Sequence, residues 1–280
     1  MSTGSPIRGL LFRLIDDAAV FPPGNASVAT AVEEHRRHRR AWYADCIGPL
    51  LLRPAQVAGA LDLLRSGDDL GIGLVAQSGL LDVAYARDLL LDHDESAALV
   101  QIEVALPAAH DIGAATQTLL TELAFSVPTY VEVPRTGWQP ALDVLAEDGA
   151  EHAKYRTGGE TPQAHPSESE LAAFLRGCLD RNLGFKLTAG LHHAVRTTTD
   201  RGFEQHGLLN VLAAVTAGLD GADHGDLAAL LADRSVDSLV ALVDKADVAA
   251  VRRVFRSFGC CGVTDPLDEL VVLGLLSPED

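Results

Sequence analysis

Residues 151–190 read EHAKYRTGGETPQAHPSESELAAFLRGCLDRNLGFKLTAG, and this stretch carries the pattern that decides the fold. Its two ends, 151–156 and 183–190, have the length of strands, and the segment between them has the apolar spacing of a helix. Ser167 stands three residues before Glu170, which is the capping-box spacing at the start of that helix. A strand–helix–strand unit predicts two parallel strands joined by a right-handed crossover.

The same alternation extends in both directions from this unit. Further strands are predicted at 13–18, 46–52, 70–77, 98–106, 129–134 and 253–263. Helices are predicted at 28–40, 54–65, 80–91, 111–123 and 140–147. Seven strand–helix units before residue 200, spaced roughly 25 to 30 residues apart, predict a single (β/α)8 barrel of the TIM type. An open doubly wound sheet is the alternative, but no GxGxxG fingerprint follows the first strand.

The last quarter of the chain is less regular than the rest. An apolar helix is predicted at 208–219, and a further helical region covers 226–250. We interpret residues at about 200–250 as a helical insertion that precedes the last strand. Pro266 falls in the first turn of a closing helix, where proline is well tolerated. No segment has the composition of a linker, so the sequence predicts one domain over 1–280.

Composition and charge exclude several classes of protein. The 280 residues carry a net charge of −17, whereas nucleic acids and anionic membranes require a basic surface. The apolar patch near the N-terminus is interrupted by Arg13 and two acids, so it resembles neither a signal peptide nor a membrane span. We expect a cytoplasmic protein with reduced thiols, no nucleic-acid or membrane partner and a small-molecule substrate; a homo-oligomer is possible. The cysteines, too few for a disulfide framework, are Cys46, Cys178, Cys260 and Cys261.

In such a barrel the active site lies at the carboxyl ends of the strands. Polar residues late in the predicted strands, or directly after them, are therefore the candidates for a functional site. They are Asp16, Asp17, Arg53, Gln77, Glu103, Glu132, Lys154, Arg156, Lys186, His192, His193 and Cys261.

Lysine is rare in this chain, which uses arginine for most of its positive charge. The three lysines are Lys154, Lys186 and Lys245, and the first two fall on adjacent predicted strands. Neighbouring parallel strands lie about 4.8 Å apart, so two inward-facing ammonium groups at the same height repel each other. Repulsion and burial both lower the pKa of an amine, which predicts one neutral, nucleophilic lysine. Alternatively, each lysine pairs with a barrel carboxylate such as Glu103 or Glu132.

The turn after the sixth predicted strand, RTGG at 156–159, offers a second kind of candidate group. Arg156, Thr157, Gly158 and Gly159 present a guanidinium, a hydroxyl and two flexible amides, which suit a carboxylate or phosphate. A plain glycine turn between strand and helix is the alternative. The remaining candidates for substrate binding are Arg53, Glu132 and His193.

Four short windows resemble deoxyribose-phosphate aldolase and related Schiff-base barrel aldolases: LIDDAAVFPPGNAS (14–27), EVALP (103–107), AKYRTGG (153–159) and FKLTAG (185–190). The resemblance implies that Lys154 forms the Schiff base and that Lys186 perturbs it. Glu103 takes the place of the family's proton-relaying Asp, and Asp16 matches its first-strand aspartate. The HH pair at 192–193, the SFGCCG segment and the insertion depart from that family. The fragments DDAAVFPP, KYRTGG and FKLTAGLHH also resemble an uncharacterised bacterial family of barrel-sized proteins.

Three functions follow from these patterns. The first is an aldolase-type lyase without a cofactor, in which Lys154 forms an iminium with a small anionic oxo compound. There Glu103 or Asp16 moves protons, and His192 serves as a general acid or base. The second is a metal-dependent isomerase or hydrolase that uses His192, His193 and His206, with Cys261 as a further ligand. No HxH, HExxH or CxxC motif supports it. The third is a barrel that binds a small anion without catalysis.

Overall fold

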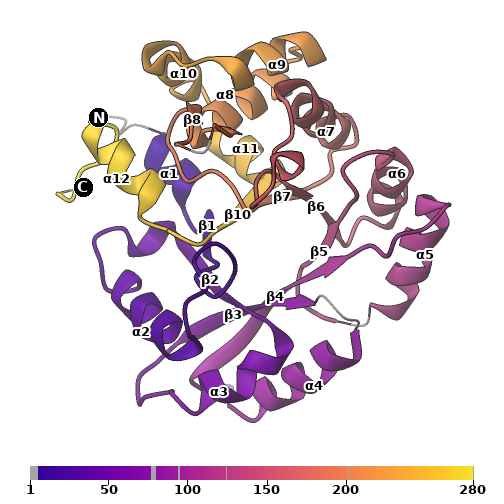
Figure 1. The fold of residues 1–280 in the computed structure, drawn as a ribbon, viewed down its shortest axis with the longest axis vertical. Coiled ribbons are helices and arrows are strands. Elements are labelled where there is room, and N and C mark those ends of the chain that lie inside the picture. The colour runs from indigo at the N-terminus through magenta and orange to yellow at the C-terminus, as the bar shows by residue number, and fades with distance from the viewer. Residues whose placement is uncertain (1–5, 77–79, 94, 124, 201, 280) are drawn as a thin grey trace.

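Eight parallel strands close into a barrel, and the helices form an outer ring around it (Figure 1). The computed structural model describes residues 6–76, 80–93, 95–123, 125–200 and 202–279. Going round the barrel, β1 to β7 follow in sequence order and β10 lies between β7 and β1. The predicted (β/α)8 barrel is therefore confirmed. The barrel strands are β1 (Ile15–Asp17), β2 (Ile47–Leu52), β3 (Leu70–Ala76), β4 (Ala97–Ala105), β5 (Thr129–Glu132), β6 (His152–Arg156), β7 (Phe185–Thr188) and β10 (Phe255–Cys260).

The outer helices begin where the sequence supplies side-chain caps. The Ser167 hydroxyl accepts a hydrogen bond from the main-chain N–H of Glu170, and the predicted capping box is present. Ser27 and Asp111 cap α2 and α5 in the same way. These helices are α1 (Ile7–Leu11), α2 (Val28–His38), α3 (Val57–Leu61), α4 (Leu80–Leu91), α5 (Ile112–Glu122), α6 (Gln139–Asp148), α7 (Glu168–Asp180) and α12 (Asp265–Val272), with short 3-10 turns at Ala44–Cys46, Pro54–Gln56 and Pro162–Ala164.

The segment between β7 and β10 contains a small hairpin and four helices. α8 is buried on almost every side among α7, α9, α10 and α11, with α9 and α10 at the periphery (Figure 1). The final strand, predicted from 253, starts at Phe255, because Arg253 and Val254 belong to α11, which Asp247 caps. The elements of this segment are β8 (Thr197–Thr198), β9 (Glu204–Gln205), α8 (Leu208–Leu219), α9 (His224–Ala232), α10 (Val236–Val243) and α11 (Val248–Val254).

Two barrel strands are shorter than predicted because residues beside them have positive φ. Arg13, at φ 47°, stands just before β1, and Ala189, at φ 61°, follows β7. A non-glycine residue in this left-handed region cannot continue an extended strand. The chain therefore turns sharply at both places.

Aromatic side chains packed on the outer face of three barrel strands explain which of the neighbouring side chains point into the barrel. On β6, β7 and β10 the aromatic residues Tyr155, Phe185, Phe255 and Phe258 are buried. Phe174 of α7 stacks on Tyr155 and meets Phe185 edge to face, and Phe255 stacks on both Phe185 and Phe258. Each such side chain contributes about 1.5–3 kcal/mol when it is fully buried. Successive residues of a strand point to opposite faces, so packing Tyr155, Phe185 and Phe258 outside turns Lys154, Lys186 and Ser257 toward the barrel axis.

Among the described residues, no helix combines the length and the apolar composition that crossing a bilayer requires.

Candidate functional site

Two lysines meet inside the barrel at the same height. Lys154 of β6 and Lys186 of β7 are register partners, as the strand alignment predicts. Glu103 of β4 lies between them, with its Oε2 2.7 Å from the Nζ of Lys154 and its Oε1 2.6 Å from the Nζ of Lys186. One carboxylate thus bridges both ammonium groups.

Further carboxylates extend this group into a line of alternating charges. The Nζ of Lys154 lies 2.7 Å from Oε2 of Glu132, and Lys186 forms an ion pair with Asp16. The side chains of Gln101 and Ser257 also donate hydrogen bonds to Oδ2 of Asp16, at 2.8 Å and 2.9 Å. We call this set the ion cluster; its members are Asp16, Lys186, Glu103, Lys154 and Glu132, and Arg156 adjoins it with Nε 3.2 Å from Oε1 of Glu132.

The carboxylates reverse the pKa change expected for the lysines. Burial disfavours the charge on Lys154, but Glu103 and Glu132 outweigh it and raise the pKa of this amine above its usual value. Burial likewise opposes the charge on Lys186, and its carboxylate partners raise the pKa. The prediction of a lowered amine pKa is therefore wrong, because the two lysines share a carboxylate instead of facing each other alone. The alternative, in which each lysine pairs with a barrel carboxylate such as Glu103 or Glu132, is the arrangement observed.

The pKa values of the three carboxyl groups in the ion cluster change in different directions. Burial opposes the charge on Glu103, yet the two ammonium groups lower its pKa to about 2. The pKa of Glu132 is also lowered, by Lys154 and Arg156 against the effect of burial. Burial dominates at Asp16 and raises the pKa of that carboxyl despite Lys186. A proton is thus held more easily at the Asp16 end than at the Glu103 centre.

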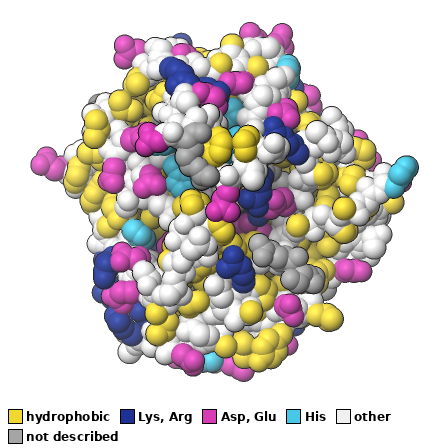
Figure 2. All heavy atoms as spheres, viewed as in Figure 1, with side chains coloured by type: hydrophobic (Ala, Val, Ile, Leu, Met, Phe, Trp, Pro, Cys, Tyr) yellow, Lys and Arg dark blue, Asp and Glu magenta, His cyan; other side chains and the backbone are white. Residues whose placement is uncertain are grey.

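One cavity reaches the ion cluster from the carboxyl ends of the strands. Its volume is about 320 Å³, and it is lined by Lys154, Glu103, Glu132, Arg156 and Thr188 together with apolar residues that include Phe21. We call it the mouth cavity. Lys186 does not line it and is 0% exposed, so Lys154 is the amine that faces this space. Figure 2 shows acidic and basic side chains gathered near the centre of the molecular face.

The RTGG turn is built mainly for packing between two loops. The Thr157 hydroxyl donates to the main-chain oxygen of Thr188 at 3.1 Å, and its side chain is buried. A Cβ on Gly158 would overlap the main-chain oxygen of Ala189, so the close approach of these loops requires glycine. Gly159 would similarly meet the Ala164 side chain. Of this turn, only Arg156 lines the mouth cavity.

The predicted histidine group does not come together. Nδ1 of His193 lies 2.6 Å from a Glu269 oxygen, and His206 is buried with Nε2 2.9 Å from the main-chain oxygen of Pro166. His192 instead contacts residues at the end of β10 and the start of α12. Its Nδ1 lies 2.9 Å from Oδ2 of Asp265 and 3.4 Å from Sγ of Cys260.

The His192 group is compact enough to hold a metal ion. Ligand atoms of His192, Cys260 and Asp265 all lie within 4.8 Å of one another. Cys261 approaches the other ring nitrogen, Nε2, at 3.7 Å, so it stands on the opposite side of the imidazole from this group. Burial opposes a charge on the imidazole, but Asp265 and the thiols raise the pKa of His192.

The remaining candidates lie apart from the ion cluster. Asp17 points away from the barrel axis, where its Oδ2 lies 2.9 Å from Nδ1 of the buried His35. Arg53 lies over the ring of Phe21, 4.6 Å from its centroid, at the edge of the mouth cavity. Gln77 is outside the described residues.

The sequence interpretation missed Gln101 and Ser257, which hydrogen-bond Asp16. Gln101 stands two residues before Glu103 on the same strand, so the period-two alternation of a strand places both on one face. That signal was available in the sequence. Ser257 offers no comparable signal, because its role depends on β1 and β10 meeting at the barrel closure.

The fold and the ion cluster define a (β/α)8 barrel with a buried lysine–carboxylate centre. The chain matches no protein-family model, and searches of curated proteins and of solved structures return no match either. The functional argument therefore depends on the geometry of the site.

Proposed function

We propose that this protein is a lyase of the class I aldolase type, in which Lys154 forms a Schiff base with a small anionic oxo compound. One observation carries the proposal: of the two lysines in the ion cluster, Lys154 lines the mouth cavity and has a carboxylate on each side at 2.7 Å. Resemblance to Schiff-base barrel aldolases assigns the same role to this residue.

The first step needs an uncharged amine, and the neighbouring carboxylates supply a route to it. A substrate that fills the mouth cavity expels water, and a lower local polarity favours a neutral amine–acid pair over two separated charges. Lys154 then passes one proton to Glu132, which is the more accessible of its two partners. The freed lone pair attacks the carbonyl carbon and forms a carbinolamine.

The proton on Glu132 is used again in the next step. Glu132 returns it to the departing hydroxyl, water leaves, and the carbinolamine becomes an iminium on Lys154. The iminium accepts the electron pair of the bond between the α and β carbons as that bond breaks. At the same time the Glu132 carboxylate takes the proton of the β-hydroxyl, and the departing fragment leaves as a carbonyl compound. Glu132 then returns this proton to the enamine carbon, and water hydrolyses the iminium, which releases the second product and restores the amine. Arg156 at the rim holds the anionic end of the substrate. Lys186, fully buried, positions Glu103 and balances its charge.

Reductive trapping tests this proposal directly. Borohydride added with pyruvate, glyoxylate or acetaldehyde converts an iminium into a stable secondary amine, and peptide mass spectrometry locates it. We expect the adduct on Lys154 and none on the Lys154→Arg variant. Lys245→Arg is the matched control, because Lys245 lies outside the ion cluster and its loss leaves trapping unchanged. Equal labelling of the Lys154→Arg variant contradicts the proposal. Binding of these compounds without trapping favours the non-catalytic anion-binding barrel instead.

A second candidate function is a metal-dependent isomerase or hydrolase, which the His192 group favours. A thiolate, an imidazole and a carboxylate suit zinc and similar ions, and three protein ligands leave a fourth position for an activated water. This set replaces the predicted His192–His193–His206 set. Elemental analysis of untagged protein tests it: one metal ion per chain, kept in His193→Ala and lost in His192→Ala, supports a metal enzyme. Metal content that is equal in both variants, or absent from the wild type, contradicts it.

A further inference from the structure

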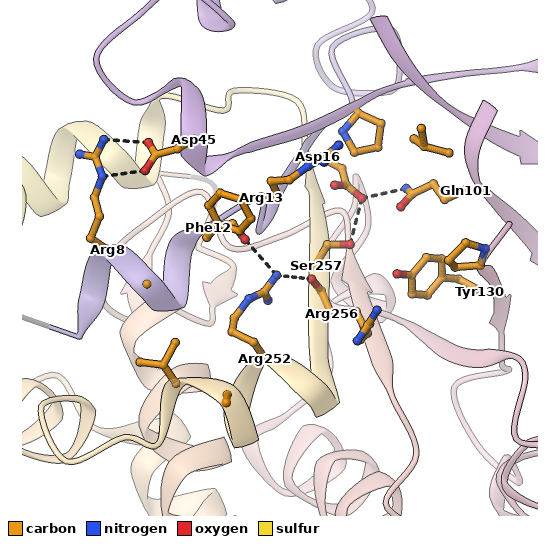
Figure 3. Close-up of a pocket in the computed structure, with 16 residues that line it drawn as sticks. Arg8, Phe12, Arg13, Asp16, Asp45, Gln101, Tyr130, Arg252, Arg256 and Ser257 are labelled. Carbon is orange, nitrogen blue, oxygen red and sulfur yellow. Dashed lines mark hydrogen bonds and ion pairs between the residues drawn. The ribbon is translucent and has the colours of Figure 1, made fainter. Parts of the chain in front are cut away.

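A second, larger cavity opens at the end of the barrel where the strands begin (Figure 3). Its volume is about 950 Å³, and we call it the base cavity. Asp16 lines it, and so do Gln101 and Ser257, the two residues that hydrogen-bond Asp16. The ion cluster therefore has the base cavity at its Asp16 end and the mouth cavity at its Lys154 end. Lys186 and Glu103 fill the barrel between them, so a molecule in the base cavity does not reach Lys154.

The base cavity collects more positive than negative charge. Its two carboxyl groups, Asp16 and Asp45, are already ion-paired with Lys186 and Arg8, and Asp16 offsets only part of the charge near Arg252. Four arginines line it, and one of them, Arg8, is paired with Asp45 at 2.7 Å. The other three, Arg13, Arg252 and Arg256, form no ion pair with any carboxylate of the described residues. Exposed arginines elsewhere, such as Arg39 and Arg253, also form no ion pair with a carboxylate of the described residues. The base cavity differs from those places because three such guanidinium groups line one cavity.

Main-chain oxygens hold the central guanidinium in place. Arg252 donates hydrogen bonds to the main-chain oxygens of Phe12 at 3.2 Å and Arg256 at 2.7 Å (Figure 3). It also donates to the main-chain oxygen of Phe255. These contacts fix its position without neutralising its charge. Burial and the nearby charge of Arg256 lower the pKa of Arg252 to about 10. An anion in the cavity would relieve this unfavourable concentration of charge.

The walls of the base cavity suit the carbon skeleton of a ligand. Phe12 is 57% exposed, and it lines the cavity with Tyr130, Pro49 and Val248. Arg13, in the left-handed conformation at φ 47°, is held in a sparsely populated backbone region beside them. Apolar walls with a few convergent polar groups are typical of small-molecule sites.

We propose that the base cavity is a second binding site, for a small organic anion. Its phosphate or carboxylate group is held by Arg13, Arg252 and Arg256, and its apolar part lies against Phe12 and Tyr130. This site is independent of the Schiff-base proposal, because it uses no residue that faces the mouth cavity.

Calorimetric titration at low ionic strength tests the proposal with three probes: inorganic phosphate, phenyl phosphate and benzoate. We expect phenyl phosphate to bind one molecule per chain, and to bind more tightly than inorganic phosphate, which cannot contact the apolar walls. Benzoate distinguishes a carboxylate site from a phosphate site. Arg256→Gln and Arg13→Gln each weaken the binding by about tenfold or more, because each removes a charged hydrogen-bond donor.

Arg253→Gln is the matched control, because Arg253 is the next residue on α11 after Arg252, is exposed and does not line the cavity. It removes the same charge and leaves the affinity within about twofold, since an exposed charge at that distance is screened. Arg13→Lys keeps the charge and restores part of the affinity, and the exposed Arg13 tolerates either change without loss of the fold. Three results overturn the proposal: no binding of any probe to the wild type, equal losses in Arg253→Gln and Arg256→Gln, or loss of binding in Arg156→Gln, which places the anion in the mouth cavity.

Discussion

The two ends of this barrel handle charge in opposite ways. In the ion cluster next to the mouth cavity, each ammonium group has two carboxylate partners, and the rim arginine is paired as well. Around the base cavity, three guanidinium groups have no carboxylate partner among the described residues. A compensated cluster can move protons internally while its total charge stays the same. The three guanidinium groups of the base cavity have no anionic partner, and a negatively charged ligand can take that place. The comparison separates a region suited to proton transfer from one suited to anion binding.

The largest expected change in stability comes from removing the charge of Glu103, the central carboxylate of the ion cluster. Glu103→Gln leaves both ammonium groups without their shared partner, and breaking a buried ion pair in this way costs about 3–5 kcal/mol. Chemical denaturation should show this loss in the free energy of unfolding. Glu147→Gln, at an exposed position on α6, is the control and should change the unfolding free energy by less than about 0.5 kcal/mol. An unchanged stability in Glu103→Gln would mean that the mouth end does not depend on charge compensation.

Lowering the pH should reduce the contribution of the ion cluster to the free energy of unfolding, and the pKa of Glu103 defines the pH range. The pKa of Glu103 is about 2 in the folded protein against an ordinary 4.5, so folding favours its charged form. Its contribution, about 3 kcal/mol, is fully present above pH 4.5 and is lost as the pH falls toward 2. Asp16, whose pKa burial raises, acts in the opposite direction. Unfolding free energies measured between pH 6 and pH 2 should fall less steeply in Glu103→Gln than in the wild type; parallel curves contradict the prediction.

At the uncompensated end, removing a charge has a smaller effect because repulsion is relieved at the same time. Arg252→Gln loses hydrogen bonds to the main-chain oxygens of Phe12 and Arg256 but also separates two like charges. We expect a net destabilisation of about 1–2 kcal/mol by thermal or chemical unfolding. Arg253→Gln, its exposed neighbour, serves as the reference. A gain in stability would show that repulsion dominates this end even more than the structure indicates.

The smallest effect is expected at the rim of the mouth cavity. Arg156 is half-exposed, and its ion pair with Glu132 is accessible to solvent, so Arg156→Gln should lower the unfolding free energy by less than about 1 kcal/mol. If Arg156 holds the anionic end of a substrate, the same variant raises KM while trapping on Lys154 persists. A stability loss as large as that of Glu103→Gln would place Arg156 inside the compensated cluster and remove the distinction between centre and rim.

The sequence predicted the barrel well because each strand carries its own local signal. The eight strand regions and the pairing of Lys154 with Lys186 follow from apolar runs, caps and the alternation of strand and helix. The sequence left open whether the lysines repel each other or pair with Glu103 and Glu132, and the raised lysine pKa values depend on the second arrangement, in which Glu103 reaches both amines from β4. Hydrophobic periodicity tells which side chains point inward but not which of them touch across the axis.

Other errors have the same origin. Thr157 was expected to bind an anion, yet its hydroxyl bonds Thr188 because two loops pack closely. The base cavity joins Arg13 to Arg252 and Arg256 from opposite ends of the chain, and no local pattern connects them. His192 likewise meets Asp265 through the fold, not through sequence proximity. Contacts between distant segments are the part of the site that one sequence does not reveal.

The pairing of β1 with β10 has a consequence for how the chain is made. During synthesis β1 emerges long before residue 255, so its free edge and that of β7 stay open until β10 has been made. Open strand edges recruit other chains. A chain that stops before β10 should therefore aggregate rather than form a smaller barrel, and Asp16 on β1 would lose its hydrogen bond from the Ser257 hydroxyl on β10.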